Sequence, residues 1–292
     1  MLKTRGEKIF NIFNYFIMLL LSFTMLFPIW HVMMFSLSNA DLTMGRGLFF
    51  TPAGFSLKAY EIVLRDSTLI TAYRNTIIVT LGGTLLNLVF SFLMAYPLSR
   101  NDFSGKKPLT FMLFFTMLFS GGLIPTYLVI RQTGMLNSLW ALIIPGAVNA
   151  YNVFVLRNFI KTIPYSLVES AKIDGANEFI ILARIIIPLS KPVIAVLALM
   201  YGVGHWNSWF NCVIYITDRS KFTLQPILRD LLFVMNSVEF FKHDVDLNFG
   251  QSQMPEVVKM ATVVVATLPV MLVYPFLQKY FIKGALLGAV KG

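Results

Sequence analysis

The chain has 292 residues, of which 57% are hydrophobic and only 13% are charged, and its net charge is +10. A soluble globular domain has about 25% charged residues. The low charge and a mean hydropathy of +0.71 therefore exclude an ordinary soluble domain and indicate lipid surroundings. The 24 Lys and Arg residues are scattered between apolar runs, so they form no basic stripe for nucleic acid. The single cysteine, Cys212, excludes an intrachain disulfide framework and is predicted to be a buried or lipid-facing thiol.

Six charge-free runs in the sequence are long enough to cross a bilayer. Because hydrocarbon offers no water to free backbone groups, a span must be a helix of about 20 apolar residues or part of a closed barrel. The runs are continuously apolar and do not alternate, which favours helices. We expect an all-α membrane protein with a single transmembrane domain over 1-292. Its predicted spans lie at about 9-38, 72-99, 108-130, 134-156, 192-216 and 258-280.

The first run has a basic start at Lys3, Arg5 and Lys8, as a signal peptide would. A signal core is about 7–15 residues long, however, and this run is much longer, so we expect an uncleaved first span. With the N-terminus placed in the cytoplasm, the inner segments carry 14 Lys and Arg residues and the outer segments carry 10. Basic residues favour the inside, so the N-terminus is predicted to be cytoplasmic.

This orientation places a long segment before the fifth span in the cytoplasm. Ser166 and Glu169 have the spacing of a capping box, which predicts a helix starting just after Ser166. Gly175 should end that helix, and Asn177 should cap a second one that stops at Pro188. Two short helices joined at a glycine form a compact, partly apolar element. It suits either a groove on a partner protein or the lipid surface.

The motif in this segment resembles that of a known family. Glu169-Ser-Ala-Lys-Ile-Asp-Gly-Ala176, followed by Ile187-Pro-Leu189 and Pro192, resembles the EAA loop of ABC importer permeases. In that family the loop is the coupling helix that docks into a cleft of the ATPase subunit. The resemblance makes 164-192 the coupling loop, although Ser170 replaces the usual first alanine. It implies ATPase coupling for Glu169, Ser170, Ala171, Asp174, Gly175 and Ala176.

Other segments resemble the carbohydrate branch of this family, the six-span maltose-type inner-membrane subunit. They are Gly121–Tyr127, Trp140–Gly146, Gly204–Phe210 and Gly288–Gly292. Within the branch, the chain is most similar to permeases for oligosaccharides and polysaccharide fragments such as those of alginate or pectin. The resemblance implies a type I ABC importer permease fold and a multi-pass protein of the bacterial cytoplasmic (inner) membrane.

The family's partners and chemistry follow from the same resemblance. We expect a second permease subunit, two ATPase subunits, an extracytoplasmic solute-binding protein, membrane lipid and a sugar or oligosaccharide substrate. The chain is expected to be non-catalytic and to bind no cofactor or metal, with ATP and Mg used by the partner ATPase. The only Gly-Lys pair, Gly105-Lys106, lacks the spacing of a phosphate loop.

Polar side chains inside the spans are candidates for the substrate pathway, because such groups tend to face the bundle interior or a wet cavity. Asn207 and Asn211 are four residues apart and would share one face of the fifth helix. Amides can bond sugar hydroxyls, and aromatic rings can pack on C–H faces. The predicted pathway residues are His205, Trp206, Asn207, Trp209 and Asn211, with Asn149, Tyr151 and Asn152 from the fourth span.

Each pathway residue also has a structural interpretation. Trp209 could be an interfacial anchor, Asn207 interhelical glue and His205 a packed histidine. Helix packing explains the fourth-span residues equally well, and Asn87 in the second span is interpreted as interhelical glue. Gly121, Gly122 and Pro125 are predicted to break the third span near its outer end.

The outer loop 218-256 would touch the binding protein if the resemblance holds, or would only pack on its own bundle. An ion-gradient-driven secondary carrier is the first alternative function. It would need acidic residues in the spans, yet all 14 lie outside the charge-free runs. An intramembrane protease would need a Gly-x-Ser or His-Glu-x-x-His motif within a span. The sequence has no His-Glu-x-x-His, and its Gly-x-Ser matches, Gly54-Phe-Ser56 and Gly250-Gln-Ser252, lie outside the predicted spans. An ABC permease for a non-sugar solute remains open.

Overall fold

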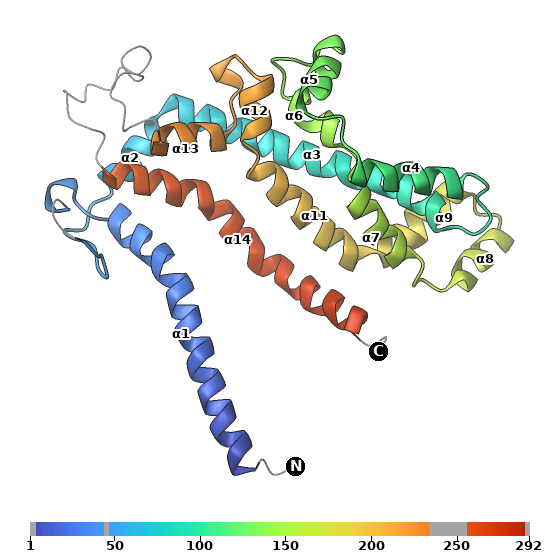
Figure 1. Cartoon of the computed structure of the whole chain (residues 1–292), viewed down its shortest axis with the longest axis horizontal. Coiled ribbons are helices and arrows are strands. Elements are labelled where there is room, and N and C mark those ends of the chain that lie inside the picture. The colour runs from blue at the N-terminus through green and yellow to red at the C-terminus, as the bar shows by residue number, and fades with distance from the viewer. Residues whose placement is uncertain (1–3, 44–46, 234–255, 290–292) are drawn as a thin grey trace. The chain divides into compact units, whose positions relative to one another are not determined.

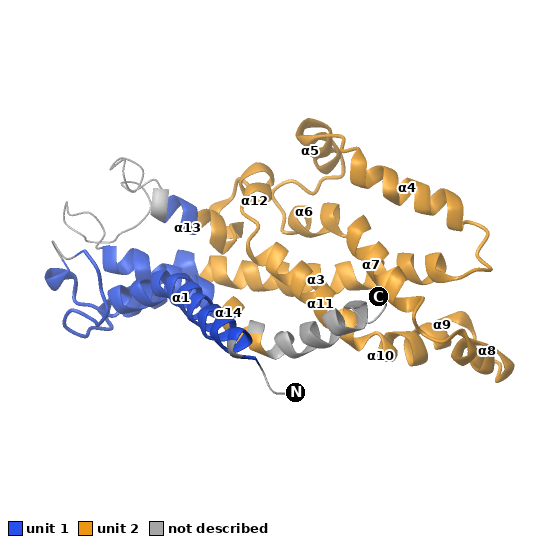
Figure 2. Ribbon diagram, turned by 60° about the horizontal axis from the view of Figure 1, so that its bottom comes forward, with its two compact units in different colours: residues 1–69, 228–269 blue, residues 70–227, 270–292 orange. Residues whose placement is uncertain are grey.

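The structure is a computed structural model that describes residues 4–43, 47–233 and 256–289. The chain divides into two compact units, residues 1–69 with 228–269 and residues 70–227 with 270–292 (Figure 2). Within the described ranges the fold is helical, and its one β pairing is the isolated antiparallel bridge between Ser38 and Phe55. The predicted all-α class is therefore confirmed.

The helices follow in chain order (Figure 1). The first five are α1 (Arg5–Ser36), α2 (Lys58–Arg65), α3 (Ser67–Ser99), α4 (Lys106–Leu118) and α5 (Leu123–Gln132). The middle ones are α6 (Trp140–Ile143), α7 (Ala150–Ile160), α8 (Tyr165–Ile173), α9 (Glu178–Ile181) and α10 (Ile187–Leu189). The last are α11 (Lys191–Trp206), α12 (Phe210–Tyr215), α13 (Leu224–Phe233) and α14 (Glu256–Ala289). Short 3-10 turns lie at Ala40–Leu42, Ile144–Gly146 and Arg219–Lys221, and a π-helical segment lies at Leu182–Ile186.

The first unit is organised by the two ends of α1. At its start, the Thr4 hydroxyl accepts from the backbone N–H of Glu7, and the Glu7 carboxylate accepts from the N–H of Thr4. This capping box satisfies two of the N–H groups that a helix start leaves unpaired. At its end, the chain turns back so that Ser38 pairs with Phe55.

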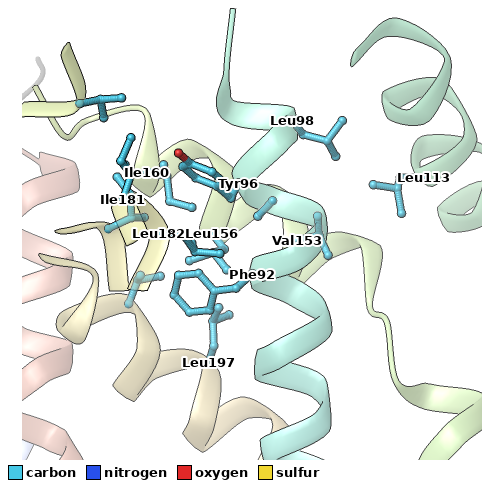
Figure 3. Close-up of a cluster of buried hydrophobic side chains, with 14 of the residues drawn as sticks. Phe92, Tyr96, Leu98, Leu113, Val153, Leu156, Ile160, Ile181, Leu182 and Leu197 are labelled. Atoms are coloured by element: carbon cyan, nitrogen blue, oxygen red, sulfur yellow. The ribbon is translucent and has the colours of Figure 1, made fainter. Parts of the chain in front are cut away.

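The second unit is held by a buried cluster that joins six helices (Figure 3). Phe92 and Tyr96 of α3 pack there with Leu197 of α11. The remaining members come from α3, α4, α7, α8, α9, the π-helical segment and α11: Ala95, Leu98, Leu113, Val153, Leu156, Ile160, Val168, Ala171, Ile181, Leu182, Ile186, Val193 and Tyr201. Because α8 and α9 contribute to this cluster, the two short helices are packed against the long ones.

A second buried cluster lies where α5, α6 and α12 meet α3. It contains Val79, Ile130, Ala141, Leu142, Ile143, Cys212, Tyr215 and Ile216. Cys212 is fully buried there, which confirms one of the two predicted environments for this thiol.

Three described helical stretches are long and apolar enough to cross a membrane: Gly6–Ser36, Ser67–Ser99 and Glu256–Val273. Three bent helix pairs would raise the number to six if each is one span. They are Lys106–Leu118 with Leu123–Gln132, Trp140–Gly146 with Ala150–Ile160, and Glu178–Leu189 with Lys191–Trp206, bent by 118°, 52° and 81°. The six-span arrangement thus stays a prediction.

The predicted break of the third span is confirmed. Helix α4 ends at Leu118 and α5 begins at Leu123, with Gly122 before it at a φ of 85°. That left-handed conformation is strained for any residue with a side chain, so a glycine is required at this bend.

One detail predicted for the coupling loop, the capping box at Ser166, is wrong. Helix α8 begins at Tyr165, directly after Pro164, with no side-chain cap, so Ser166 lies inside the first turn instead of before it. The second helix contains a π-helical segment at Leu182–Ile186 and ends at Leu189, within one residue of the predicted stop at Pro188. Pro188 is therefore the penultimate residue of this helix, and the chain turns at Ser190 before α11 begins.

Candidate functional site

The first candidate site comprises α8, α9 and the turn between them. We call these residues, 164–181, the knob. The N–H of Ala176 donates to the carbonyl of Ala171 at 2.9 Å, and the N–H of Gly175 donates to the carbonyl of Lys172 at 3.0 Å. Gly175 has a φ of 81°. These two bonds around a left-handed residue are the Schellman motif, which ends a helix and pairs its last carbonyls. The predicted stop at Gly175 is thereby confirmed.

The same geometry explains the spacing of the motif. Ala171 is buried and Ala176 is partly buried in one cluster, so two small side chains meet across the turn. The side chain of Asn177 accepts from the N–H of Ile180, which confirms the predicted cap of the second helix. Ala171, Gly175 and Ala176 therefore build the turn.

The other predicted coupling residues, Glu169, Ser170 and Asp174, lie exposed on the knob. Beside them are two large apolar side chains, Ile173 at 86% and Phe179 at 76% exposure. The surface of the knob thus combines carboxylates with exposed apolar side chains, which suits a complementary groove on a partner protein.

An ion network joins the knob to the end of α3. Lys172 binds Glu178 at 2.8 Å, and the Arg100 guanidinium lies 3.2 Å from Asp102 and 3.6 Å from Glu178. The Tyr96 hydroxyl donates to the second oxygen of Glu178. Arg100 is only 8% exposed in its side chain, so its charge depends on these two carboxylates more than a surface arginine's would.

The hydrogen bond from Arg100 holds the pKa of Asp102 below its ordinary value. A carboxylate whose pKa is lowered by folding stabilises the fold above its unfolded-state pKa. That stabilisation disappears as the pH falls through the lower, folded-state pKa. The network is therefore intact at neutral pH and weakens only in strong acid.

The second candidate site lies where α11 crosses α3. Asn87 of α3 donates through its amide nitrogen to the carbonyls of Gly146 and Ala147, at 2.5 and 3.0 Å. Its amide oxygen lies 2.7 Å from Nε2 of His205. Because the amide oxygen can only accept, His205 must carry its proton on Nε2. Asn87 thus links three segments, which confirms its interpretation as interhelical glue.

The bend between α6 and α7 explains why Asn87 is needed. A broken helix leaves carbonyls unpaired, and such groups must be satisfied inside protein or in a wet cavity. The side chain of Asn87 supplies the partners for Gly146 and Ala147. His205 packs closely on α3 because Gly83 has no side chain: a Cβ there would lie 2.5 Å from Nε2 of His205.

The predicted shared face of Asn207 and Asn211 is wrong. Helix α11 ends at Trp206, and Asn207 is its C-terminal cap with φ −89° and ψ 0°. Asn211 belongs to α12, which begins only at Phe210. Asn and Ser compete for backbone hydrogen bonds and favour turns, which accounts for the interruption.

The break places the fifth-span candidates in different surroundings. Trp206 is buried, and its ring meets that of Tyr73 edge-on at 5.7 Å. Asn207, Trp209 and Asn211 are exposed.

The fourth-span candidates divide in the same way. The side chain of Asn149 accepts from the N–H of Asn152 and so caps α7. Tyr151 is 55% exposed, whereas Asn152 is buried. Exposed and buried candidates therefore both lie within a few residues of the break between α11 and α12 and of the bend between α6 and α7.

The outer loop 218-256 is described only in part, since residues 234–255 lie outside the described ranges. Its start is tied to α3, because the amide of Asn75 donates to the carbonyls of Ser220 and Phe222 at 2.9 and 3.0 Å. A contact with a binding protein stays a prediction.

The ion network and the Asn87–His205 contact are not predicted by the sequence. Arg100 and Asp102 follow the end of a predicted span, and Glu178 follows the predicted cap at Asn177. The signal available was the presence of charged residues directly beside a span end, but nothing in the spacing shows that the end of α3 meets the knob.

The fold and these sites define a helical, multi-pass membrane protein. No family model matches the chain. The polygalacturonan/rhamnogalacturonan transport system permease protein YtcP of Bacillus subtilis (strain 168) is 41% identical over 286 residues, covering 98% of this chain and 99% of that protein. The arabinooligosaccharides transport system permease protein AraQ of the same organism is 28% identical over 279 residues, covering 94% and 93%.

A solved bacterial ABC transporter involved in the import of the acidic polysaccharide alginate has a chain with a TM-score of 0.88 and 31% identity, covering 96% of this chain and 99% of that one. A second structure, the alginate transporter in complex with an alginate pentasaccharide-bound periplasmic protein, matches with a TM-score of 0.54 and 13% identity over 94% and 96%, which shows a shared fold. The chain belongs to the carbohydrate ABC importer permeases.

Replacing Gly83 by Ala should displace the His205 ring and break its bond to Asn87. We expect a loss of about 1–3 kcal/mol in the free energy of unfolding, the usual cost of overpacking. Gly82→Ala is the matched control, because its Cβ would lie 3.9 Å from Ile143, an ordinary contact. Thermal unfolding of both variants in detergent checks this, and equal melting temperatures would contradict it.

Replacing Glu178 by Gln should loosen the knob, because Lys172 and the buried Arg100 lose one shared anion. We expect a destabilisation of about 1–2 kcal/mol, seen as faster amide hydrogen exchange in α8. Glu61→Gln is the control, since the Glu61–Arg65 pair is solvent-exposed and worth only a few tenths of a kcal/mol. Unchanged exchange in α8 would show that packing alone holds the knob.

Proposed function

We propose that this chain is the permease subunit of an ATP-driven importer of oligosaccharides and that the knob couples it to the ATPase. The observation that carries the proposal is the knob itself, in which exposed Ile173 and Phe179 stand on helices anchored by buried residues. A rigid element with bare apolar tips transmits a push from a partner into the bundle. The relatives named as carbohydrate permeases support the same function.

The proposed coupling works through packing and the ion network together. When the ATPase subunits close on ATP and Mg, they would shift the knob, and the cluster shared with α3, α7 and α11 would carry the shift into the spans. The shift changes the preferred state only if the partners bind the outward and inward states with different affinities. The chain itself would contribute docking and a pathway, without catalysis or a bound cofactor.

The proposed substrate pathway uses the exposed residues beside the two bends. Asn207, Asn211 and Asn149 would offer amides, and Trp209 and Tyr151 would offer rings. His205, Trp206 and Asn152 would support these residues from behind, since His205 is bonded to Asn87 and the other two are buried.

The remaining assignments follow from the family and the charge pattern. Six spans with a cytoplasmic N-terminus would place the knob in the cytoplasm and the segment after α12 outside. The assembly would pair this chain with a second permease, two ATPase subunits and an extracytoplasmic solute-binding protein. The similarity to a solved importer of the acidic polysaccharide alginate, at 31% identity, supports a carbohydrate polymer or oligosaccharide as cargo.

Ile173→Ser should weaken docking of the ATPase, because it removes an 86% exposed apolar tip from the proposed contact. We expect at least about tenfold less ATPase to co-purify with the permease pair, as for an interface hot spot. Leu189→Ser in α10, 46% exposed and outside the knob, is the matched control. Co-purification of both permeases confirms folding, and normal ATPase recovery with Ile173→Ser would remove this residue from the interface.

The assembled importer should hydrolyse ATP faster when its binding protein carries an oligosaccharide. The measurement is ATPase activity of the purified complex in lipid nanodiscs with the binding protein empty, loaded with uronic-acid oligosaccharides or loaded with arabinooligosaccharides. Stimulation by a loaded sugar identifies the substrate class. Stimulation only by a peptide- or lipid-loaded protein would overturn the oligosaccharide assignment and leave the permease assignment standing.

A further inference from the structure

A hollow of about 740 Å³ lies beside the start of α4 in the second unit. Its lining combines cations with aromatic rings: Lys106, Lys107, Arg157, Phe111, Phe114 and Phe154. Neither the knob nor the proposed pathway uses any of these side chains. The hollow is therefore a separate feature that needs its own explanation.

The cations of the hollow have no anionic partner among the described residues. Arg157 and Lys106 are held by backbone carbonyls, with Nε of Arg157 2.9 Å from the oxygen of Leu98 and Nζ of Lys106 2.9 Å from that of Arg100. The ion pairs of the described chain involve other residues. Three positive charges are thus brought together and left without a carboxylate.

The excess of positive charge also affects the neighbouring Lys161. The pKa of Lys161 lies below its ordinary value because of partial burial and because Arg157 and Lys106 repel its proton. Nearby carboxylates do not offset this: Asp102 and Glu178 are engaged with Arg100 and Lys172. An external anion would relieve the repulsion among these cations.

The apolar part of the hollow extends along the same helix face. Lys107, Phe111 and Phe114 follow each other at intervals of four and three residues, so they share one side of α4. Phe111 is 69% and Phe114 is 51% exposed. The face therefore offers positive charge at the helix start and bare rings one and two turns further into the apolar segment.

We propose that this hollow binds an anionic phospholipid, with the phosphate of the headgroup among Lys106, Lys107 and Arg157 and an acyl chain along Phe111 and Phe114. The order of cations and aromatic rings along α4 matches the order of headgroup and acyl chain in a lipid. A soluble phosphate or an acidic loop of a partner protein would contact the cations but not the rings. The proposal rests on the proposed function only for the leaflet, which is the one beside the knob.

Lys107 is the residue to change, because it is exposed and forms no ion pair among the described residues. A juxtamembrane cation is worth about 1 kcal/mol against anionic lipid, so Lys107→Gln should weaken binding about fivefold and Lys107→Glu about thirtyfold. Lys191→Gln, an exposed cation at the start of α11 outside the hollow, is the matched control and should bind like the wild type.

The probe is phosphatidylglycerol mixed with phosphatidylcholine in nanodiscs that hold the intact importer. Native mass spectrometry counts the phosphatidylglycerol retained, and recovery of all subunits verifies assembly independently of ATPase activity. Graded loss in the two Lys107 variants alone supports the proposal. Equal retention by Lys107→Glu would overturn it, as would full displacement of the lipid by inorganic phosphate. A photo-crosslinker at position 111 that captures a protein subunit in place of lipid would also overturn it.

Discussion

A chain that crosses hydrocarbon has to pair its own backbone groups, and each bend in a helix makes that harder. Three bent helix pairs lie within the described part of the chain, and at such bends side chains can replace the lost backbone bonds. Asn87 does this for the bend between α6 and α7, where its amide N–H groups donate to two carbonyls and its amide oxygen accepts a hydrogen bond from Nε2 of His205. One amide therefore fixes the relative positions of α3, α11 and the α6–α7 bend.

The knob solves a related problem by a different means. Its helix end is closed by two backbone bonds around Gly175, and the neighbouring alanines fit into the buried cluster. The ion network with Arg100 and Glu178 then fixes its orientation against the end of α3. Packing makes the knob rigid, and the ion network fixes its orientation against α3. Both properties suit an element that transmits force.

The sequence predicted those features that depend on local chemistry. Continuous apolar runs predicted helices, the glycines at 121–122 predicted a break, and Gly175 and Asn177 predicted the two ends of the turn. It failed where tertiary contacts decide. The second coupling-loop helix contains a π-helical segment before Pro188, and α11 stops at Trp206, so the helix face expected to carry both Asn207 and Asn211 is divided. The partners of Asn87 and Arg100 lie far away in sequence, and no spacing rule indicates them.

The knob has two kinds of residues, those that build its turn and those exposed on its surface, and this affects which positions can vary in evolution. The small residues Ala171, Gly175 and Ala176 are constrained because they build the turn, whereas Glu169, Ile173 and Phe179 are exposed. The outward positions are therefore free to vary without unfolding the subunit. If the ATPase docks on the knob as proposed, a permease of this design could change its ATPase partner through a few substitutions at these exposed positions.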